Sequence, residues 1–510
     1  MKRRKFIYQS SIGFVGLLPV VDRLKILKTG LPSSQGPFLA TGIKIGEVTT
    51  TSAIVWARLT KDLERVGKPA PVPQVLYLDE SNGEWHAVAY FKEKYKEDRP
   101  DREVKVIYPE GHDVTMLEGA AAGAPGSLRV HYRPKGGVKW ETTAWKEVNN
   151  GTDYATQFVL NALAPDTEYE LKVEGRGVKG GAATTALSGR LETALPADRK
   201  KDLGFVVTTC HEYNHQDIPQ EGFKIYKHMR ALDPAFMVHT GDVVYHDQVA
   251  KDLSLAYWNW QRMFALSTCT EFYRQVPCYF MKDDHDTWMN DCYPGSADRF
   301  MGRFTFDEGV RVFNQQVPIG PSPYRTIRWG KDLQVWLVEG REYRSRNDIP
   351  DGPDKTIWGK VQMEWFKESF RQSDATFRVL ISPTPIVGPD RPQKKDNHAN
   401  SGFAHEGRLI REFLASQRDV FIVCGDRHWQ YASQDSQTGL MEFSCGPASD
   451  EHAGGWPKDD KLPEHHYLNI VGGFLGVDIK QEGDRCRIFF THYGVDGEKL
   501  YSENFINSQV

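Results

Sequence analysis

Four short polar stretches constrain this chain more than any other feature, because each directly follows an apolar run typical of a buried strand. The stretches are Thr209-Cys210-His211, Gly241-Asp242-Val243-Val244-Tyr245, Asp283-Asp284-His285-Asp286 and Gly425-Asp426-Arg427-His428. The runs before them span residues 203–207, 235–239, 276–281 and 420–424. Open α/β folds keep their sites at the carboxyl edge of the sheet. We therefore expect these thiol, phenol, imidazole and carboxylate groups to meet at one such edge, where they could hold metal ions.

The length of the chain indicates more than one domain. A chain of 510 residues exceeds what one hydrophobic core usually serves. The net charge of -4 provides no overall basic field, so we expect no nucleic-acid binding surface. Seven cysteines are too few for a disulfide scaffold of this length, although Cys269 and Cys278 could pair in an oxidising compartment.

The first residues are typical of an export signal. A basic start, Lys2-Arg3-Arg4-Lys5, precedes an apolar run over residues 12–21 that is shorter than the ~20 residues a bilayer requires. The Arg3-Arg4 pair resembles a twin-arginine signal. We expect residues 1–36 to be signal and linker, with the twin-arginine export machinery as a partner and a periplasmic or secreted location. The alternative is a basic, unstructured terminus. No other stretch of the sequence reads as a transmembrane segment.

Residues 37–195 are predicted to form an all-β domain. Apolar and polar residues alternate with period two over residues 43–48 and 52–58, as expected for half-buried strands. Residues 163–169 read Leu-Ala-Pro-Asp-Thr-Glu-Tyr, which resembles the tyrosine corner of fibronectin type III and immunoglobulin-like sandwiches. We expect Trp56 in the core of this sandwich and a long inserted loop over residues 91–127.

Residues 202–510, after a polar linker at 196–201, are predicted to form an α/β domain. Helices are expected at residues 223–232, 253–266, 360–372 and 406–417. Further strands are expected at residues 333–338, 377–381, 467–479 and 485–493. Alternating strands and helices favour substantially parallel sheets, arranged as a layered β-sandwich with flanking helices.

The chemistry of the four stretches favours metal ligands over purely structural roles. Asp242 carries two oxygens that can bridge two cations, and Tyr245 follows it three residues later. The carboxylates of Asp283, Asp284 and Asp286 repel one another unless a cation or a helix N-terminus neutralises them. The structural alternatives are a helix cap at residues 283–286 and, for Cys210, a small buried hydrophobe.

The order of these residues resembles the binuclear metallophosphoesterase superfamily, with departures that point to one branch of it. Cys210 stands where the superfamily has its first Asp, Asp284 replaces an Asn, and Asp426 replaces a His. These departures match the alkaline phosphatase D (PhoD-like) family over nearly the whole chain. Residues 339–344, Glu-Gly-Arg-Glu-Tyr-Arg, are also similar to that family, which usually has Asp in place of Glu339.

The resemblance implies two unlike metal positions joined by Asp242. Cys210, Asp242, Tyr245 and His428 would hold Fe³⁺, since thiolate, phenolate and imidazole suit a redox-capable metal. Asp242, Asp284 and Asp426 offer oxygen alone, and would hold one or two Ca²⁺ ions, with Mn²⁺ or Mg²⁺ as alternatives.

The predicted function is exported, metal-dependent hydrolysis of a small or polymeric phosphoester, as an alkaline phosphatase or phosphodiesterase. In this prediction, metal-bound hydroxide attacks phosphorus in line, and His285, oriented by Asp286, donates the proton to the leaving group. The candidate phosphate-binding residues are Arg262, Arg341 and Arg344. The alternatives are a hydrolase of another ester, such as a phospholipid head group or a sulfate ester, and an exported binding protein with an inert α/β domain.

Overall fold

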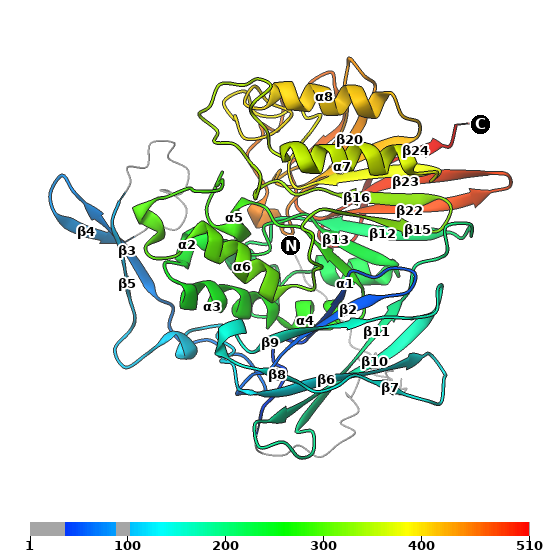
Figure 1. The fold of residues 1–510 in the computed structure, drawn as a ribbon. Helices are drawn as coiled ribbons and strands as arrows, with labels where there is room; N and C mark the ends of the chain where they lie inside the picture. Colours follow the sequence, from blue (N-terminus) through cyan, green and yellow to red (C-terminus); the bar gives the residue numbers. More distant parts are fainter. Residues whose placement is uncertain (1–35, 88–101, 509–510) are drawn as a thin grey trace, which may run out of the picture. The chain divides into compact units, whose positions relative to one another are not determined.

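A computed structural model describes residues 36–87 and 102–508 of the chain. The predicted export signal therefore lies outside the described residues, apart from residue 36. Two large sheets organise the described part (Figure 1). A nine-stranded sheet has the order β24-β23-β22-β12-β13-β14-β1-β2-β9, and a seven-stranded sheet has the order β15-β16-β17-β18-β20-β19-β21.

The strands of the nine-stranded sheet come from both predicted domains. Their bounds are β1 Ile43–Gly46, β2 Ala53–Arg58, β9 Ala155–Leu160, β12 Leu203–Thr208, β13 Phe236–His239, β14 Cys278–Phe280, β22 Phe474–Glu482, β23 Arg485–Tyr493 and β24 Lys499–Ile506. The seven-stranded sheet consists of β15 Arg325–Trp329, β16 Leu333–Leu337, β17 Phe377–Ser382, β18 Val420–Cys424, β19 Gln430–Gln434, β20 Met441–Cys445 and β21 His465–Asn469.

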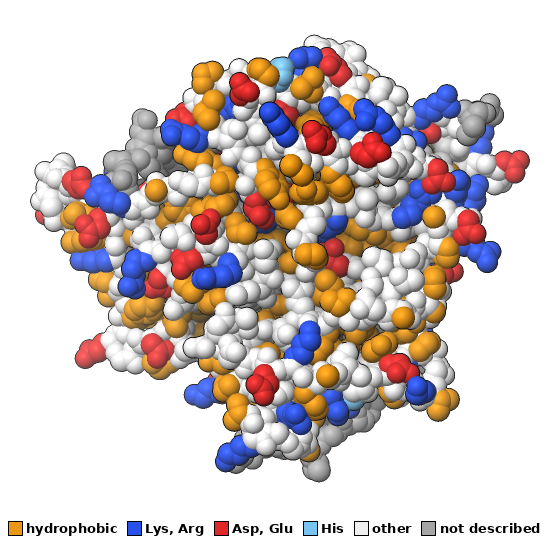
Figure 2. Space-filling view, viewed as in Figure 1, with side chains coloured by type: hydrophobic (Ala, Val, Ile, Leu, Met, Phe, Trp, Pro, Cys, Tyr) orange, Lys and Arg blue, Asp and Glu red, His pale blue; other side chains and the backbone are white. Residues whose placement is uncertain are grey.

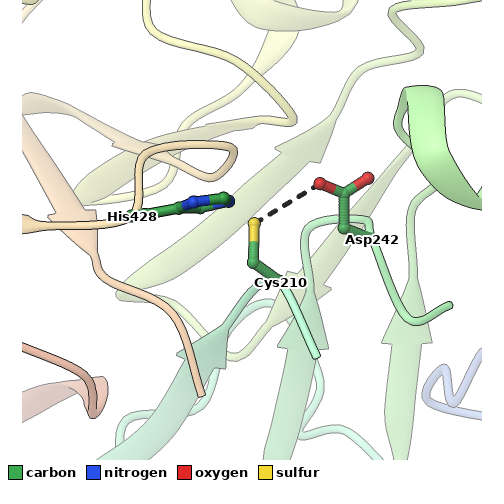
Figure 3. A group of neighbouring side chains, drawn as sticks. All are labelled: Cys210, Asp242 and His428. Carbon is green, nitrogen blue, oxygen red and sulfur yellow. Dashed lines mark hydrogen bonds between the residues drawn. The ribbon is translucent and has the colours of Figure 1, made fainter. Parts of the chain in front are cut away.

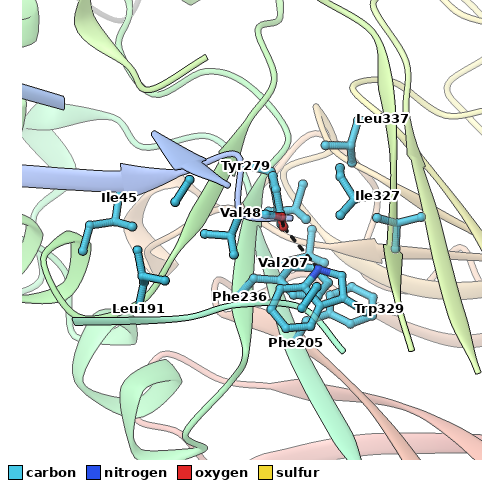
Figure 4. Close-up of a cluster of buried hydrophobic side chains, with 14 of the residues drawn as sticks. Ile45, Val48, Leu191, Phe205, Val207, Phe236, Tyr279, Ile327, Trp329 and Leu337 are labelled. Carbon is cyan, nitrogen blue, oxygen red and sulfur yellow. Dashed lines mark hydrogen bonds between the residues drawn. The ribbon is translucent and has the colours of Figure 1, made fainter. Parts of the chain in front are cut away.

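The two large sheets pack face to face over one apolar core. Phe236 of β13 stacks on Trp329 of β15, with ring centroids 5.1 Å apart. The Trp329 indole N–H donates to the hydroxyl of Tyr279 in β14 at 3.2 Å (Figure 4). Tyr279 in turn donates to the backbone carbonyl of Val48 at 2.5 Å. The buried polar atoms of these side chains are thus paired with one another, as burial requires.

Helices cover the outer faces of both sheets, which confirms the predicted layered sandwich. Their bounds are α1 Ile225–Ala231, α2 His246–Val249, α3 Leu253–Phe264, α4 Ser267–Tyr273, α5 Asp284–Thr287, α6 Phe306–Gln316, α7 Gly359–Gln372 and α8 Ala404–Ala415. Helix α7 buries Gln362, Phe366 and Phe370, spaced four residues apart on one face. Phe366 and Phe370 pack with Trp336 of the seven-stranded sheet and Ile410 of α8. Phe280 and Met237 of the other sheet pack in one cluster with residues of α1, α3, α4 and α6.

The N-terminal region is an all-β, fibronectin-like sandwich that shares a sheet with the α/β region. A second sheet packs against β1, β2 and β9; it consists of β6 Gly126–Pro134, β7 Glu141–Thr142, β8 Lys146–Val148, β10 Glu168–Gly177 and β11 Thr185–Glu192. The Tyr169 hydroxyl accepts the backbone N–H of Ala164 at 2.8 Å, as a tyrosine corner requires. Strand β1 pairs in parallel with β14, Gly46 opposite Cys278. The described residues, 36–87 and 102–508, accordingly belong to one compact unit.

Several sequence predictions need correction. Trp56 is fully buried, but its ring lies near Phe264 of α3 and its indole N–H donates to the Gln315 carbonyl, so it packs on the α/β region. The predicted strand 467–479 is two strands in different sheets, β21 and β22. Cys269 and Cys278 are both free thiols.

The predicted inserted loop also contains a strand. β5, Val104–Ile107, forms a three-stranded sheet with β3, Gln74–Asp79, and β4, Glu84–Ala87. Residues 91–101 of that predicted loop lie outside the described residues. None of the helices in the described ranges combines the length and apolar character needed to cross a bilayer. On the face seen in Figure 2, acidic and basic side chains are interspersed.

Candidate metal centre

The four polar stretches meet where the two large sheets adjoin. Three of them follow the neighbouring strands β12, β13 and β14, and the fourth follows β18 of the other sheet. The backbone N–H of Asp426 donates to Thr209 Oγ1 at 3.3 Å, which joins the loop after β18 to the loop after β12. The prediction of convergence is correct, but the site is built from two sheets rather than from one edge.

The backbone at the site is strained at three non-glycine residues. Cys210, Asp242 and Asp426 have φ values of 51°, 59° and 62°, in the left-handed region. Such conformations cost about 1–3 kcal/mol each and persist where the surrounding structure fixes them. Gly241 removes one obstacle, because a Cβ at this position would lie 2.7 Å from the backbone nitrogen of Asp283. The chain thus accepts strain in order to bring these side chains together.

Cys210, Asp242 and His428 form the first group of possible metal ligands. One ligand atom from each lies within 4.8 Å of the others, and the three side chains point toward one another (Figure 3). The Cys210 thiol donates to Asp242 Oδ2 at 3.4 Å. The Tyr245 hydroxyl donates to the same oxygen at 3.5 Å. The four residues predicted to hold the iron therefore lie together. Cys210 and Tyr245 both bond to one oxygen of Asp242, and His428 lies within 4.8 Å of Cys210 and Asp242.

The oxygen-rich ligands fall into two further groups, each of which includes Asp242. Asp242 lies with Asp284 and His285 in one group, and with Asp283 and Asp426 in the other. The sequence prediction placed Asp284 and Asp426 together and assigned no ligand role to Asp283. Asp283 ends the turn before α5 and forms the capping box of that helix with Asp286. Its position at the helix cap, directly before the predicted ligand Asp284, is the signal in the sequence that could have identified Asp283.

Burial and mutual repulsion favour protonated groups at the centre of the cluster. Burial raises the pKa of Asp242 well above its ordinary value, and the neighbouring Asp284 and Asp283 raise it further. Burial likewise raises the pKa of the Cys210 thiol, with added contributions from Asp242 and Asp426. Asp284 differs: burial opposes ionisation, but Arg341 and His285 outweigh it and lower its pKa to about 2.

The donor set fits bound cations. Asp283 keeps one buried carboxylate oxygen, Oδ2, without a hydrogen-bond partner among residues 36–87 and 102–508. Its other oxygen accepts from Arg341 at 2.6 Å, a guanidinium that also lies 3.8 Å from Asp284. Arg427 pairs with Asp426 but is shared with Asp390 and Asp396. Arg341 and Arg427 therefore cannot neutralise the carboxylates of Asp242, Asp283, Asp284 and Asp426 together. Cations held by these oxygens, with the thiol, phenol and imidazole alongside, would supply the missing positive charge.

His285 is oriented by Asp247 rather than by Asp286. His285 Nδ1 lies 3.1 Å from Asp247 Oδ1, and both side chains are buried. The Asp286 carboxylate instead accepts the backbone N–H groups of Val243 at 3.1 Å and Asp283 at 2.8 Å. Asp286 therefore fixes the two loops that carry the ligands, and the prediction that it orients the imidazole is wrong. Asp247 lies in helix α2, two residues after Tyr245, and is not part of the stretch Gly241-Asp242-Val243-Val244-Tyr245.

His452 is a second residue that the sequence analysis missed. It ends a short 3₁₀ turn, Asp450–His452, far along the chain from the four stretches. Its Nε2 lies 3.5 Å from the Tyr245 hydroxyl, its Nδ1 lies 3.3 Å from the Cys210 carbonyl oxygen, and its ring centroid lies 4.0 Å from that of His428. His452 thus contacts three of the residues expected to hold the iron.

The three predicted phosphate-binding arginines have different surroundings. Arg341 is buried and pairs with Asp283 inside the cluster. Arg262 packs against the rings of Tyr213 and Trp258 at 4.4 and 4.3 Å, and its Nε donates to Asn259. Arg344 is buried, and two of its nitrogens, Nε and Nη1, have no hydrogen-bond partner among the described residues. Of the three, only Arg341 contacts the acidic cluster directly.

Two mixed sheets packed face to face between helices, with candidate metal ligands at their adjoining strand ends, form a sandwich of the metallophosphoesterase type. A sequence model of the family described as PhoD-like phosphatase matches residues 205–467, more than half of the chain. The chain belongs to the PhoD-like phosphatase family. No curated protein matches it in sequence.

Two solved structures share the fold at low sequence identity. The chain is similar to a structure of PhoD, with 14% identity, a TM-score of 0.68, and coverage of 94% of this chain and 91% of that one. It is also similar to the purple acid phosphatase PPD1 from yellow lupin (Lupinus luteus) seeds, with 13% identity and a TM-score of 0.55. That comparison covers 89% of this chain and 79% of the lupin protein. At these identities the likeness concerns the fold alone.

Proposed function

We propose that this chain is a metal-dependent phosphoester hydrolase, an alkaline phosphatase or phosphodiesterase. The observation that carries the proposal is the set of three ligand groups that share Asp242, at the meeting point of four loops, three of which contain a residue with a strained backbone. Strain and crowded carboxylates at one position oppose stability, so they indicate a functional site. Membership of the PhoD-like phosphatase family supports the reaction class.

In this proposal, Cys210, Asp242, Tyr245 and His428 hold Fe³⁺, and the carboxylates of Asp242, Asp283, Asp284 and Asp426 hold one or two Ca²⁺ ions. When bound, such cations polarise phosphoryl oxygens and lower the pKa of coordinated water. The thiol, phenol and imidazole favour a transition metal at the first group. The all-oxygen set favours a hard cation at the second.

The residues of the chain supply the orientation and the proton. Asp247 accepts from His285 Nδ1, so Nε2 is the nitrogen that can deliver a proton to the leaving oxygen. The His285 ring also packs against Tyr245, with centroids 4.4 Å apart, which fixes its plane beside the ligand cluster. Arg341 stays with Asp283 and holds the loop after β14 in place.

The proposal includes export. The support is the Arg3-Arg4 pair and the short apolar run that follows, which resemble a twin-arginine signal. A periplasmic or secreted enzyme would meet phosphoesters outside the cytoplasm. A fusion of residues 1–36 to a reporter, expressed with and without the twin-arginine machinery, tests this part independently of the catalytic activity.

The central experiment is metal analysis of the purified full chain, together with hydrolysis of p-nitrophenyl phosphate and its bis-ester. We expect iron and a hard divalent cation in the protein, turnover of at least one substrate, and loss of turnover after chelation with recovery on adding the metals back. A protein that contains no metal, or that hydrolyses neither ester when fully loaded, would falsify the proposal.

A further inference from the structure

Two buried cationic side chains, Arg344 and Lys355, lie together on one aromatic ring. The guanidinium carbon of Arg344 is 4.6 Å from the Phe403 ring centroid, and the Lys355 ammonium is 4.3 Å from it. Arg344 is 4% exposed and Lys355 is 3% exposed. Cation–π contacts of this kind stabilise each charge modestly, but they leave two like charges side by side.

Asn347 holds both cations in position. Its side-chain oxygen accepts from Arg344 Nη2 at 2.5 Å, and its backbone carbonyl accepts from Lys355 Nζ at 2.9 Å. Neutral oxygens orient the two groups without cancelling their charge. Arg344 Nε and Nη1 are buried and have no partner within the described part of the chain. An unpaired guanidinium in such a place costs free energy unless an anion completes it.

The carboxylates near this pair act on it through their charge but form their bonds with other groups. Asp348 pairs with Arg346 at 2.6 Å, and Asp351 accepts the backbone N–H of His405 at 2.9 Å. Asp396 lies 3.5 Å from Lys394 and 3.4 Å from Arg427, and Asp291 lies 3.3 Å from Lys394. Burial lowers the pKa of Lys355, and the neighbouring Arg344 lowers it further.

The pair lies beside the candidate metal centre. Arg344 is three residues beyond Arg341, which bonds to Asp283. Asp291, whose charge acts on Arg344, donates its backbone N–H to Asp284 Oδ2 at 2.6 Å. Arg344 and Lys355 themselves make no ion pair with Asp242, Asp283, Asp284 or Asp426 in the described structure. They are therefore placed next to the ligand cluster but are not part of it.

We propose that Arg344 and Lys355 form a subsite for a second anionic group of the substrate, a carboxylate or phosphate distinct from the phosphoryl group that reacts. This inference rests on the proposed function and narrows it to phosphoesters that carry a further negative charge. Hydrogen bonds between charged groups are strong enough to select such substrates by about 10-fold or more.

The test compares phenyl phosphate with 3-carboxyphenyl and 4-carboxyphenyl phosphate, which differ from it by one negative charge. We expect kcat/KM of the full-length, metal-loaded protein to be about 10-fold higher for at least one carboxylated ester. Arg344→Gln and Lys355→Met should reduce that ratio to near 1. Lys360→Met is the matched control, because Lys360 is exposed at the start of α7 and should leave the ratio unchanged.

A direct binding measurement separates failure of the subsite from failure of the proposed reaction. Sulfate titrated calorimetrically into the full chain should bind to the wild type and to Lys360→Met, and more weakly to Lys355→Met, whose fold is checked by thermal melting. If phenyl phosphate is hydrolysed but the wild type shows no preference for either carboxylated ester, the inference is wrong. If no ester is hydrolysed, the proposed function fails, and equal sulfate binding by all variants would overturn the subsite as well.

Discussion

Two buried carboxylates of this protein, Glu174 in the N-terminal sandwich and Asp242 in the candidate metal centre, have pKa values shifted in opposite directions. Arg129, His131 and Lys172 surround Glu174 at 2.8, 2.9 and 2.6 Å. Burial would raise its pKa, but these hydrogen bonds lower it to about 2. Asp242 lies among other carboxylates, and its pKa is raised well above the ordinary value, first by burial and then by Asp284 and Asp283.

The difference between the surroundings of Glu174 and Asp242 shows how a folded chain can form a binding site for a cation. Around Glu174 the sequence supplies the compensating cations itself, so the group is complete in the folded protein. Around Asp242 it supplies mostly further anions, on a backbone held in unfavourable φ regions. The first arrangement serves stability, and the second is stabilised when a cation binds.

Asp242→Asn breaks the comparison most strongly, because it removes one carboxylate from the crowded group. We expect metal content and hydrolysis to fall by more than the 10–100-fold typical of residues that only support a ligand. In the metal-free protein the same change should raise the melting temperature, since it removes the cost of burying an ionisable carboxyl group among other carboxylates. Elemental analysis, p-nitrophenyl phosphate turnover and melting with and without chelator measure these effects. Full activity in this variant would exclude a shared bridging role for Asp242.

Cys210→Ser tests the part of the site that contains sulfur. The variant should lose iron and any visible thiolate-to-iron absorption while it retains the hard cation, and turnover should fall by about 10–100-fold. Cys445→Ala is the control, because Cys445 is also a buried free thiol but lies in β20. An unchanged spectrum and iron content after the Cys210 change would show that the thiol is structural.

Glu174→Gln tests the other carboxylate of the comparison, whose charge is compensated by neighbouring cations. Removing the charge leaves the Arg129 guanidinium and the Lys172 ammonium uncompensated, so we expect a loss of about 1–3 kcal/mol in the free energy of unfolding at pH 7. A folded pKa of about 2 against an ordinary value of 4.5 means that this stabilisation is present above about pH 4.5. It is lost as the pH falls from there toward 2. Urea unfolding at pH 7 and pH 4 should therefore show a smaller difference between variant and wild type at the lower pH.

Lys44→Met tests a buried lysine that forms no ion pair with a carboxylate in the described structure. Lys44 Nζ lies 3.1 Å from the Trp56 ring centroid and 3.7 Å from that of Phe264, and it has no hydrogen-bond partner in the described structure. Burial, with Arg58 nearby, lowers its pKa well below the ordinary value.

Methionine fills the same space without a charge, so unfolding at pH 7 should require about 1 kcal/mol more. The unfolded chain binds the proton more tightly than the folded one, so wild-type stability should rise toward pH 10 and the difference from the variant should shrink. A variant less stable than the wild type at pH 7 would show that the two rings compensate the ammonium fully.

The sequence was sufficient to predict the layered sandwich and the convergence of the four polar stretches. Segments such as residues 420–424 and 360–372 have a local pattern of apolar and polar residues that is typical of a strand or a helix, so their positions could be predicted from the sequence. The merged sheet was not predictable, because the pairing of Gly46 with Cys278 depends on the tertiary arrangement and leaves no local pattern. Trp56 was misplaced for the same reason: alternation shows that one face of β2 is buried, but not which partner buries it.

The predicted site was accurate in composition and less accurate in its internal roles. Motif spacing identified Cys210, Asp242 and His428, which the structure brings within ligand distance of one another. It could not identify His452 or Asp247, because neither stands at a strand end and each meets the site only through folding. The choice between Asp247 and Asp286 as the partner of His285 depends on side-chain direction in α2 and α5, which spacing does not encode.

The hydrogen bond from Tyr279 to Val48 joins residues 231 positions apart. Tyr279 lies in β14, the strand that leads to Asp283. During synthesis, the first strands of the sandwich must wait for β14 before their sheet can be completed. Such non-local pairing makes folding slow, since a long loop must close before the contact forms. It also means that the N-terminal region cannot be removed as a separate module: a truncated chain would expose the edge of β14, next to the loop that carries the ligands, to pairing with other chains.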